Sequence, residues 1–373
     1  MQKELNWKHN YIKEHWFTET ILVIAQNTKL SINGVKHIAN VTLKLPKKSQ
    51  ISSEHEALQK ECEKVGIPTK DAKHYWYKGK HFSIFVGNKE VNLWDIKERI
   101  IEDMKKYSPK YPKLKYIKLK DAHLLVIDPA DIHIGKLCSA FETNDEYNHE
   151  IAIERVKSGV LGILTKSKPY NIDQILLVIG NDILHTDNSK STTTGGTFQD
   201  TNIMWYDAFN IAFKLYIDVI ETLITIAPIT IQYDPSNHDY VNGFLLAQSL
   251  QAWFRNTKNI LFNVTPSHRK YFVYGKNLIG TTHGDGAKET DLALLMAHES
   301  KDWNNCKHRY FYIHHIHHKK SKDYMSVCVE ALRSPSGTDS WHHRNGYQHS
   351  PKAIEGYIHH KEFGQISRIT HLF

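Results

Sequence analysis

Five short clusters of aspartate, asparagine and histidine could together bind metal ions, and each follows a short apolar run. Asp131 and His133 are two positions apart, so at a strand end their side chains point to the same side and can share one ion. His315 and His317 have the same spacing and can instead reach adjacent ions. One such pair is more often a surface turn than a metal site, but five clusters at successive strand ends are not expected by chance. The clusters are residues 131–135, 180–185, 236–239, 283–285 and 314–318.

The donor types in these clusters indicate which metals would bind. Carboxylate, imidazole and amide groups form a mixed oxygen and nitrogen set that suits Mn²⁺, Fe or Zn²⁺. No cysteine belongs to the clusters, which argues against a structural zinc site. A carboxylate that bridges two ions holds them about 3.5–4 Å apart, the separation used in phosphoryl displacement. The clusters therefore predict a centre of divalent metal ions.

Alternating strand and helix patterns after residue 121 would position the clusters. This alternation is typical of an α/β architecture with a buried sheet, in which ligands bind beyond the carboxyl ends of the strands, so the five clusters are expected to converge. The predicted strands are residues 124–127, 175–179, 229–232, 277–281 and 310–313, followed by a β-rich end at 324–330, 353–358 and 365–371. The predicted helices are residues 146–168, 199–227, 240–257 and 289–305.

The ordered clusters resemble the motifs of the calcineurin-like metallophosphoesterase superfamily, whose loops read D-x-H, G-D-x-x, G-N-H-[DE], a single His and G-H-x-H. All five occur in the family order within residues 121–320. The resemblance implies an α/β fold, a metallophosphoesterase β-sandwich flanked by helices. It also implies two divalent ions, Mn²⁺ first, with Fe, Zn²⁺ and Mg²⁺ as alternatives. Carried over by position, Asp131, His133 and His317 would hold one ion and Asn237, His283 and His315 the other, with Asp182 bridging them.

The same resemblance implies the catalytic roles. A metal-bound hydroxide would attack phosphorus in line, while His238 would orient the phosphate and protonate the leaving oxygen. Residues 182–185 also look like the D-L-F-H of the DNA-repair nuclease branch, whose final histidine contacts the phosphate. His185 would take that role; the alternative is a histidine at a helix start that bonds to the backbone.

Three positions depart from the family pattern. Ser236 and His314 stand where the family has glycines that serve tight turns, so the resemblance does not define the backbone there. Neither departure removes a ligand. Asn181 separates Gly180 from Asp182, and we align Asp182 with the bridging carboxylate because residues 182–185 match the D-x-x-H order.

Two further segments predict contacts with a substrate. The hydroxyl- and amide-rich loop 191–197, with Thr193 and Gly195, could cradle a phosphate or sugar, or it could be an ordinary solvated loop. Residues 334–347 include Trp341 and Arg344, a stacking ring and a cation that suit a nucleotide or a single strand. A core tryptophan with a polar rim is the alternative. The 121–373 pattern also looks like metallophosphoesterases carried by bacteriophages.

Charge separates residues 1–120 from the rest of the chain. They hold 24 basic and 13 acidic side chains, a net charge of +11, whereas residues 121–373 hold 24 and 27, a net charge of −3. This asymmetry points to a polyanionic partner, most commonly nucleic acid, although a soluble lysine-rich surface explains the charge equally well. The sequence therefore divides into a basic N-terminal domain, 1–120, and a catalytic domain, 121–373.

The N-terminal domain is predicted to be a mixed α/β or winged-helix-like module. A helix with a capping box, a Gly-Ile-Pro break, a second helix and a strand outline a winged helix-turn-helix, and a further helix and a proline- and lysine-rich linker follow. These elements are predicted at residues 53–65, 66–68, 69–77, 81–86, 92–107 and 108–120.

The remaining composition bears on location. The four cysteines lie far apart without a CxxC pair, which favours a reduced, cytoplasmic setting, the host cytoplasm if a phage encodes the protein. The first residues lack the apolar core of a signal peptide. The most apolar stretch, 216–231, is interrupted by Asp218, Glu221 and Pro228, so no membrane span is expected.

These observations predict an enzyme: a two-metal phosphodiesterase that acts on nucleic acid, first of all a DNA nuclease. Residues 1–120 would bind nucleic acid or position the substrate. A phosphoesterase acting on a small nucleotide, a cyclic nucleotide or a phosphoprotein is the first alternative, and a non-catalytic DNA-binding protein is the second. DNA is the expected partner and a membrane is not, while a monomer and a homo-oligomer are both left open.

Overall fold

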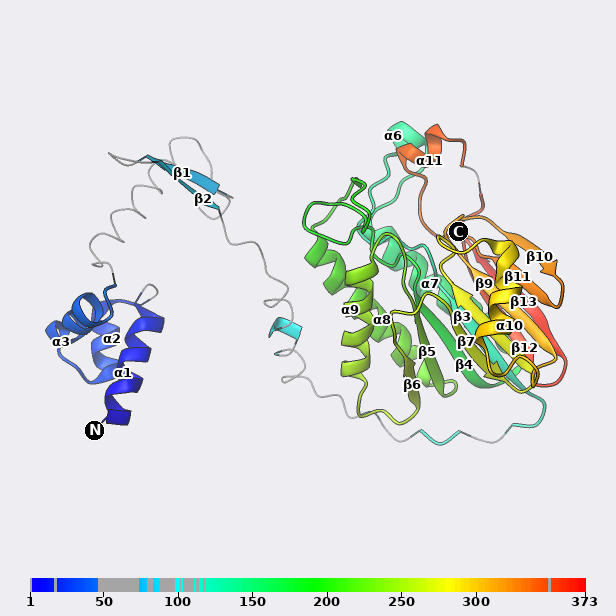
Figure 1. Ribbon diagram of the computed structural model, residues 1–373, viewed down its shortest axis with the longest axis horizontal. Helices are drawn as coiled ribbons and strands as arrows, with labels where there is room; N and C mark the ends of the chain where they lie inside the picture. Colours follow the sequence, from blue (N-terminus) through cyan, green and yellow to red (C-terminus); the bar gives the residue numbers. More distant parts are fainter. Residues whose placement is uncertain are drawn as a thin grey trace. The chain divides into compact units, whose positions relative to one another are not determined.

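The computed structural model describes residues 2–16, 19–45, 74–78, 83–87, 98–100, 102, 111, 114–116, 119–347 and 350–373. The chain divides into two compact units, Met1–Asp95 and Ile96–Phe373. Figure 1 shows the elements of each unit. Among the described residues, no helix combines the length and the apolarity that a membrane span requires.

The second unit contains two β-sheets. In the six-stranded sheet, of order β13-β12-β3-β4-β5-β6, the four strands β3 to β6 are parallel, and β12 and β13 add an antiparallel edge. Its strands are β3 (Ala122–Asp128), β4 (Asn171–Gly180), β5 (Ile229–Asp234), β6 (Ile260–Asn263), β12 (Ala353–His360) and β13 (Gly364–Leu372). The five-stranded sheet, of order β10-β11-β9-β8-β7, contains β7 (Lys270–Tyr274), β8 (Asn277–Thr282), β9 (His308–Ile313), β10 (Lys320–Tyr324) and β11 (Val327–Ala331).

The two sheets share one apolar core. Every residue of β3, β5 and β8 is buried, which explains why these strands read as continuous apolar runs instead of alternating patterns. The shared core draws side chains from both sheets, and their burial from water is the main favourable term for packing the sheets together. Its buried members are Leu124, Val126, Leu176, Val178, Tyr274, Ile279, Tyr312, Leu332 and Tyr357.

Helices cover the outer face of each sheet (Figure 1). Helix α7 (His149–Ser167) packs on β12 and β13, α9 (Tyr240–Trp253) packs on β4, and α8 (Trp205–Ile224) contacts both helices. Ile354 of β12 meets Gly159 of α7, while Tyr357, three positions along the strand, faces the shared core. Helix α10 (Leu292–Glu299), preceded by the 3₁₀ turn Glu289–Asp291, joins a second core with β8, β9 and β11.

Most elements predicted after residue 121 are confirmed. All five apolar runs are strands, and α7, α8, α9 and α10 lie within the four predicted helical ranges. The run 324–330 is not one strand, because Met325 adopts a left-handed conformation (φ 54°) and turns the chain from β10 into β11. Strands β6 and β7 are short, each has one exposed residue, and neither was predicted.

The N-terminal unit differs from its prediction. Helices α1 (Gln2–His15), α2 (Ile21–Thr28) and α3 (Ile32–His37), with a π-helical continuation at Ile38–Thr42, precede the region where helices were predicted. The predicted helix 69–77 is wrong where it is described, because β1 (His74–Lys78) pairs with β2 (Ser83–Gly87) and its Tyr-Trp-Tyr sequence favours a strand. The predicted strand 81–86 agrees with β2. The helix predicted at 53–65 and the break at 66–68 lie outside the described residues.

The predicted helix 92–107 and linker 108–120 are described only in part. Residues 98–100 and 102 are helical, as predicted. Tyr111 and Tyr116 donate hydrogen bonds to Glu221 (2.6 Å) and to the carbonyl of Ile224 (2.6 Å) in α8. These two residues therefore contact the region after 121.

Gly180, at the end of β4, allows the closest backbone approach beside the predicted site. Its φ is 92°, and a Cβ there would lie 2.0 Å from the carbonyl oxygen of Asp234 on β5. Gly196 has a similar φ of 91°, but a Cβ there would meet nothing within 4 Å. Alanine substitutions at the two glycines therefore separate the cost of the left-handed backbone from the cost of the collision between Cβ and the Asp234 carbonyl.

We expect Gly180→Ala to lower the free energy of unfolding by more than about 3 kcal/mol, because the collision adds to the left-handed penalty of about 1–2 kcal/mol. Gly196→Ala should cost only that penalty. Urea denaturation of both variants measures the difference. Equal losses would mean that β4 and β5 separate at no cost.

Candidate metal centre

The five predicted clusters converge, and they do so from both sheets. Three follow β3, β4 and β5 in one sheet, and two follow β8 and β9 in the other. The first two loops are joined by backbone hydrogen bonds, in which the N–H groups of Asp131 and His133 donate to the carbonyls of Asn181 (2.8 Å) and Asp182 (2.9 Å). The ligands of one loop are thus positioned by the next.

Asp131, His133 and His317 form the first group of donors. The Oδ1 atom of Asp131 lies 3.6 Å from Nε2 of His317, and Nε2 of His133 lies 3.4 Å from the same nitrogen. Donor atoms bound to one ion at about 2.1 Å are separated by about 3.0–3.4 Å in octahedral or tetrahedral geometry. Oδ1 of Asp131 is buried and has no hydrogen-bond partner among the described residues. This group therefore fits a metal ion.

Asp182, His283 and His315 form the second group, and Asn237 joins it. The Nε2 atom of His283 lies 3.1 Å from Oδ2 of Asp182 and 3.0 Å from Oδ1 of Asn237. The N–H of His315 also donates to Oδ2 of Asp131 (3.3 Å), which makes the two groups adjacent. The structure thus brings together the seven ligands predicted from the sequence.

The backbone of the predicted ligands is strained. Asp131, His133, Asp182, His315 and His317 all have positive φ values, between 51° and 69°. Side chains other than glycine rarely adopt this region, and such outliers gather at functional sites where the surrounding structure imposes them. Asp131 and His133 do share one group, as predicted, but the extended strand geometry assumed for them is wrong. Their direction is instead set by two left-handed residues.

The backbone at Ser236 and His314 does not require glycine. Neither Ser236 nor His314 has a positive φ. The Oγ atom of Ser236 accepts the N–H of Asp182 (2.7 Å) and donates to Oδ1 of Asp239 (2.6 Å). His314 is fully buried, and its Nε2 lies within ion-pair distance of Asp128 Oδ2 (3.2 Å), although outside hydrogen-bond geometry. Ser236 therefore helps to orient the predicted bridging residue.

Asp182 and His283 shift each other's pKa in opposite directions, as expected of a buried ion pair. Burial raises the pKa of Asp131 to about 7, against the lowering effect of His283. Burial alone would also raise the pKa of Asp182, but His283 and His238 hold it well below its usual range. Burial tends to lower the pKa of His283, yet Asp182 raises it to about 9. A proton on His283 thus occupies the position between donors that an ion would take.

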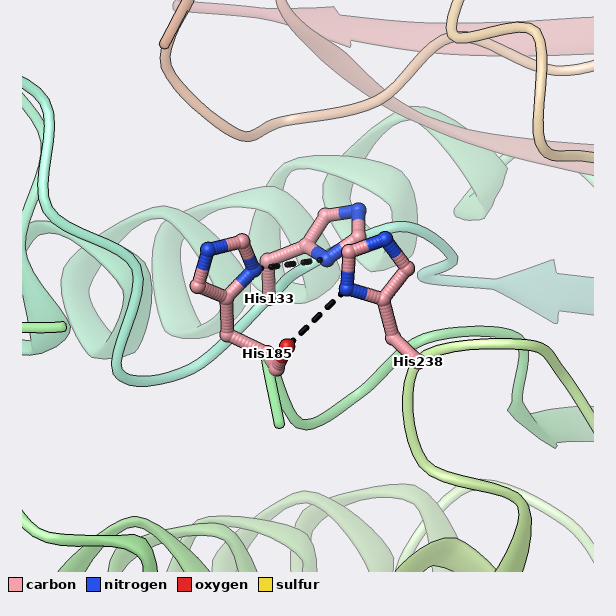
Figure 2. Close-up of side chains that lie close together, drawn as sticks. All are labelled: His133, His185 and His238. Atoms are coloured by element: carbon pink, nitrogen blue, oxygen red, sulfur yellow. Dashed lines mark hydrogen bonds between the residues drawn. The ribbon is translucent and has the colours of Figure 1, made fainter. Parts of the chain in front are cut away.

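His185 and His238 lie beside His133 of the first group (Figure 2). Nδ1 of His185 lies 3.3 Å from Nδ1 of His133, and the rings of His185 and His238 stack with centroids 5.3 Å apart. Nδ1 of His238 donates to the carbonyl oxygen of His185 (2.9 Å), which leaves its Nε2 for another partner. His185 lies outside any helix, so the alternative of a helix-start histidine is wrong.

A further cluster, Asp121, His123 and His360, lies at the opposite end of β3 and does not fit a metal ion. Nδ1 of His360 accepts the N–H groups of Glu362 (3.1 Å) and Phe363 (3.2 Å). The ring proton of a neutral His360 must then be on Nε2, which donates to Asp121 Oδ1 (3.0 Å). His360 therefore has no free lone pair to offer.

The four predicted substrate-binding residues occupy different surroundings. Thr193 is buried, and its Oγ1 accepts the N–H of Thr197 (3.1 Å) inside the loop, whereas Gly195 is exposed. Trp341 is 62% exposed and Arg344 is exposed, both on helix α11 (Ser340–Arg344). Substrate contacts by these residues stay a prediction.

A buried ion pair, which the sequence analysis missed, ties α11 to the metal centre. Nζ of Lys136 lies 2.8 Å from Oδ2 of Asp339, and the two side chains are 1% and 20% exposed. Asp339 caps α11 and accepts the Nδ1–H of His342 (2.7 Å), whose ring stacks on the ligand His317 with centroids 5.0 Å apart. Only the position of Lys136, three residues after His133, could have indicated this contact.

No protein-family model matches the sequence, and no curated protein matches it. Similar solved structures include an archaeal phosphodiesterase, with 11% identity, 67% of this chain and 99% of that chain covered, and a TM-score of 0.34. Vps29 of Entamoeba histolytica complexed with Zn²⁺ has 12% identity, coverage of 67% and 98%, and a TM-score of 0.27. A predicted phosphoesterase of Streptococcus pneumoniae has 9% identity, coverage of 67% and 97%, and a TM-score of 0.25. Similarities of this size assign no activity to this chain.

Metal binding should strengthen as the pH rises. In the metal-free protein Asp131 holds a proton below pH about 7 and His283 below about 9, so an ion must displace both protons at pH 6. From pH 6 to pH 8 we expect the apparent affinity for Mn²⁺ to rise at least about tenfold. Isothermal titration calorimetry in buffers of different ionisation enthalpy measures the affinity and the protons released. An affinity independent of pH would contradict this assignment of protons.

Lys136 and Lys157 allow a matched test of the buried ion pair. Lys157 pairs with Asp218 at the same 2.8 Å, but both side chains are about half exposed. Lys136→Met should lower the free energy of unfolding by about 3 kcal/mol, because a partly buried Asp339 loses its cation. Lys157→Met should cost under about 1 kcal/mol. Equal losses in urea denaturation would show that the buried pair has no special structural role.

Proposed function

We propose that residues 121–373 hydrolyse phosphodiesters with two divalent metal ions. The observation that carries the proposal is the pair of adjacent Asp/His groups at the ends of strands from two sheets, with His238 beside them. When bound, the ions would supply a nucleophile and offset the negative charge on the phosphoryl oxygens. The oxygen and nitrogen donors support Mn²⁺ first, with Fe, Zn²⁺ and Mg²⁺ as alternatives.

The chain's own residues would hold and orient these components. Asp131, His133 and His317 would bind one ion, and Asn237, His283 and His315 the other. Asp182 would bridge the groups, since Ser236 and the N–H of His238 fix its backbone and its Oδ1. Asp182 is preferred to Asn181 as the ligand because its Oδ2 lies 3.1 Å from Nε2 of His283, within the second group.

His238 would donate a proton to the leaving oxygen. The carbonyl of His185 accepts from its Nδ1, so the ring is fixed and Nε2 can face the reacting phosphate. The stacked His185 ring limits rotation of His238 and would contact the same phosphate.

We propose DNA as the substrate, so that the enzyme is a nuclease. Three large aromatic side chains are exposed on or near α11. The rings of Trp341 and Tyr347 are 5.8 Å apart, and Phe141 lies on α6 (Ala140–Thr143), which contacts α11. His342 of α11 stacks on His317, a predicted metal ligand, so these rings lie near the centre. Bases stack on such rings, and Arg344 adds a cation for the backbone. The net charge of +11 in residues 1–120 also favours a polyanion.

Replacing His238 tests the catalytic assignment. We expect His238→Asn to lower kcat for bis-p-nitrophenyl phosphate about 10²- to 10⁴-fold, because the proton donor is lost while every metal ligand stays. Mn²⁺ affinity measured by calorimetry should be unchanged. Unchanged hydrolysis by this variant would refute the role of His238. Lost Mn²⁺ affinity would mean that His238 acts through the metal centre.

The substrate class is tested by comparing polymer and small ester. Single-stranded DNA, duplex DNA and bis-p-nitrophenyl phosphate are supplied with Mn²⁺ over a salt series. DNA cleavage at subsaturating substrate should fall steeply with salt, while hydrolysis of the small ester changes little. Ester hydrolysis without DNA cleavage would favour a small-substrate phosphoesterase. DNA binding without any hydrolysis would favour a non-catalytic DNA-binding protein.

A further inference from the structure

Two helices of the N-terminal unit are joined by a sharp turn of three residues. Helix α2 ends at Thr28, and α3 begins at Ile32 and continues in π-helical form to Thr42. Lys29 is left-handed (φ 54°), and its N–H caps carbonyls of α2. The side chain of Ser31 then accepts the N–H of Gly34 (3.1 Å) and starts α3. Both helix ends are therefore fixed by residues of the turn itself.

This helix–turn–helix has its own apolar core. Side chains from α1, α2 and the helix 32–42 are buried against one another, and each helix contacts another of the set. The buried threonine Thr28 donates to the carbonyl of Ile24 (2.6 Å), so no polar group of that side chain is left unpaired inside. The core residues are Ile12, Trp16, Ile24, Ala25, Val35 and Ala39.

Packing leaves one face of the helix 32–42 exposed. With Val35 and Ala39 inside, Ile32, Asn33, Lys36 and His37 are exposed. Residues 21–45 contain three lysines and no aspartate or glutamate. Lys36 therefore supplies the positive charge of this face, and no carboxylate of its own segment would oppose a polyanion.

The composition of this face matches the chemistry of the DNA major groove. The groove accommodates an α-helix, an amide pairs with adenine, lysine pairs with guanine N7 and O6, and apolar groups contact the thymine methyl. Asn33 supplies the amide, Lys36 the lysine and Ile32 the apolar group. A helix–turn–helix places its second helix in this groove.

We propose that residues 21–42 form a helix–turn–helix that binds duplex DNA through the exposed face of the helix 32–42. This site goes beyond the proposed hydrolysis and does not depend on it, because none of its residues belongs to the metal centre. It also differs from the winged helix-turn-helix predicted at 53–86, whose second helix is replaced by β1 where it is described.

The test uses the full chain in EDTA, so that the metal centre contributes neither ions nor cleavage. Fluorescence anisotropy with a labelled 20-base-pair duplex compares Lys36→Glu with Lys13→Glu, which makes the same charge change at an exposed position of α1. We expect Lys36→Glu to weaken binding about tenfold or more and Lys13→Glu about twofold. Asn33→Ala should weaken binding to part of a panel of duplex sequences and leave the dependence on salt unchanged.

Two controls make the result decisive. Each variant should keep the circular dichroism spectrum of the parent, and each should keep its Mn²⁺-dependent rate on bis-p-nitrophenyl phosphate if the parent has one. Equal losses from Lys36→Glu and Lys13→Glu would mean that only overall charge matters and would overturn the proposal. So would full competition by an unlabelled single strand, because a major-groove site requires a duplex. Absent hydrolysis in the parent would refute the proposed enzyme and leave this test intact.

Discussion

Buried carboxylates at the ends of the strands are the constraint on which the rest of the site depends. Asp128, Asp131 and Asp182 are each at most 2% exposed. Charged groups out of water must be paired, protonated or bound to cations. Burial, followed by Asp234 and Asp131, raises the pKa of Asp128, while His283 keeps Asp182 ionised. The fold therefore requires protons, the paired His283 or bound cations at these carboxylates.

The strained ligand loops follow from the same constraint. A carboxylate at a buried strand end needs donors around it, and the backbone supplies some of them by leaving the extended conformation. The left-handed His315 (φ 69°) donates its N–H to Oδ2 of Asp131, and the N–H of His238 donates to Oδ1 of Asp182. Each loop thus supplies hydrogen-bond donors to the buried carboxylates of another loop. A change in one loop is expected to reach the ligands of another.

Much of this centre could be predicted because it is encoded locally. A buried parallel strand is a continuous apolar run, and the polar residues that end it identify the ligands, so the strand ends and Asp131, His133 and Asp182 were accessible from the sequence. The left-handed φ values were not, because they arise from contacts between loops. The pair Lys136–Asp339 joins positions about two hundred residues apart, and no local pattern links them. The short helices α2 and α3 were missed because their stability depends on a small shared core.

Net charge differs in sign between residues 1–120 and residues 121–373. Residues 121–373 have a net charge of −3, and two divalent ions would change it to +1 (−3 + 4). Without metal, residues 121–373 therefore repel a polyanion weakly, and with two ions bound they would not. The net charge of +11 in residues 1–120 is independent of metal. The proposed attraction of nucleic acid by residues 1–120 would thus persist at any metal concentration, while the proposed hydrolysis at the centre would require ions. Under these two proposals, metal supply alone would separate DNA binding from cleavage, which a single binding surface could not do.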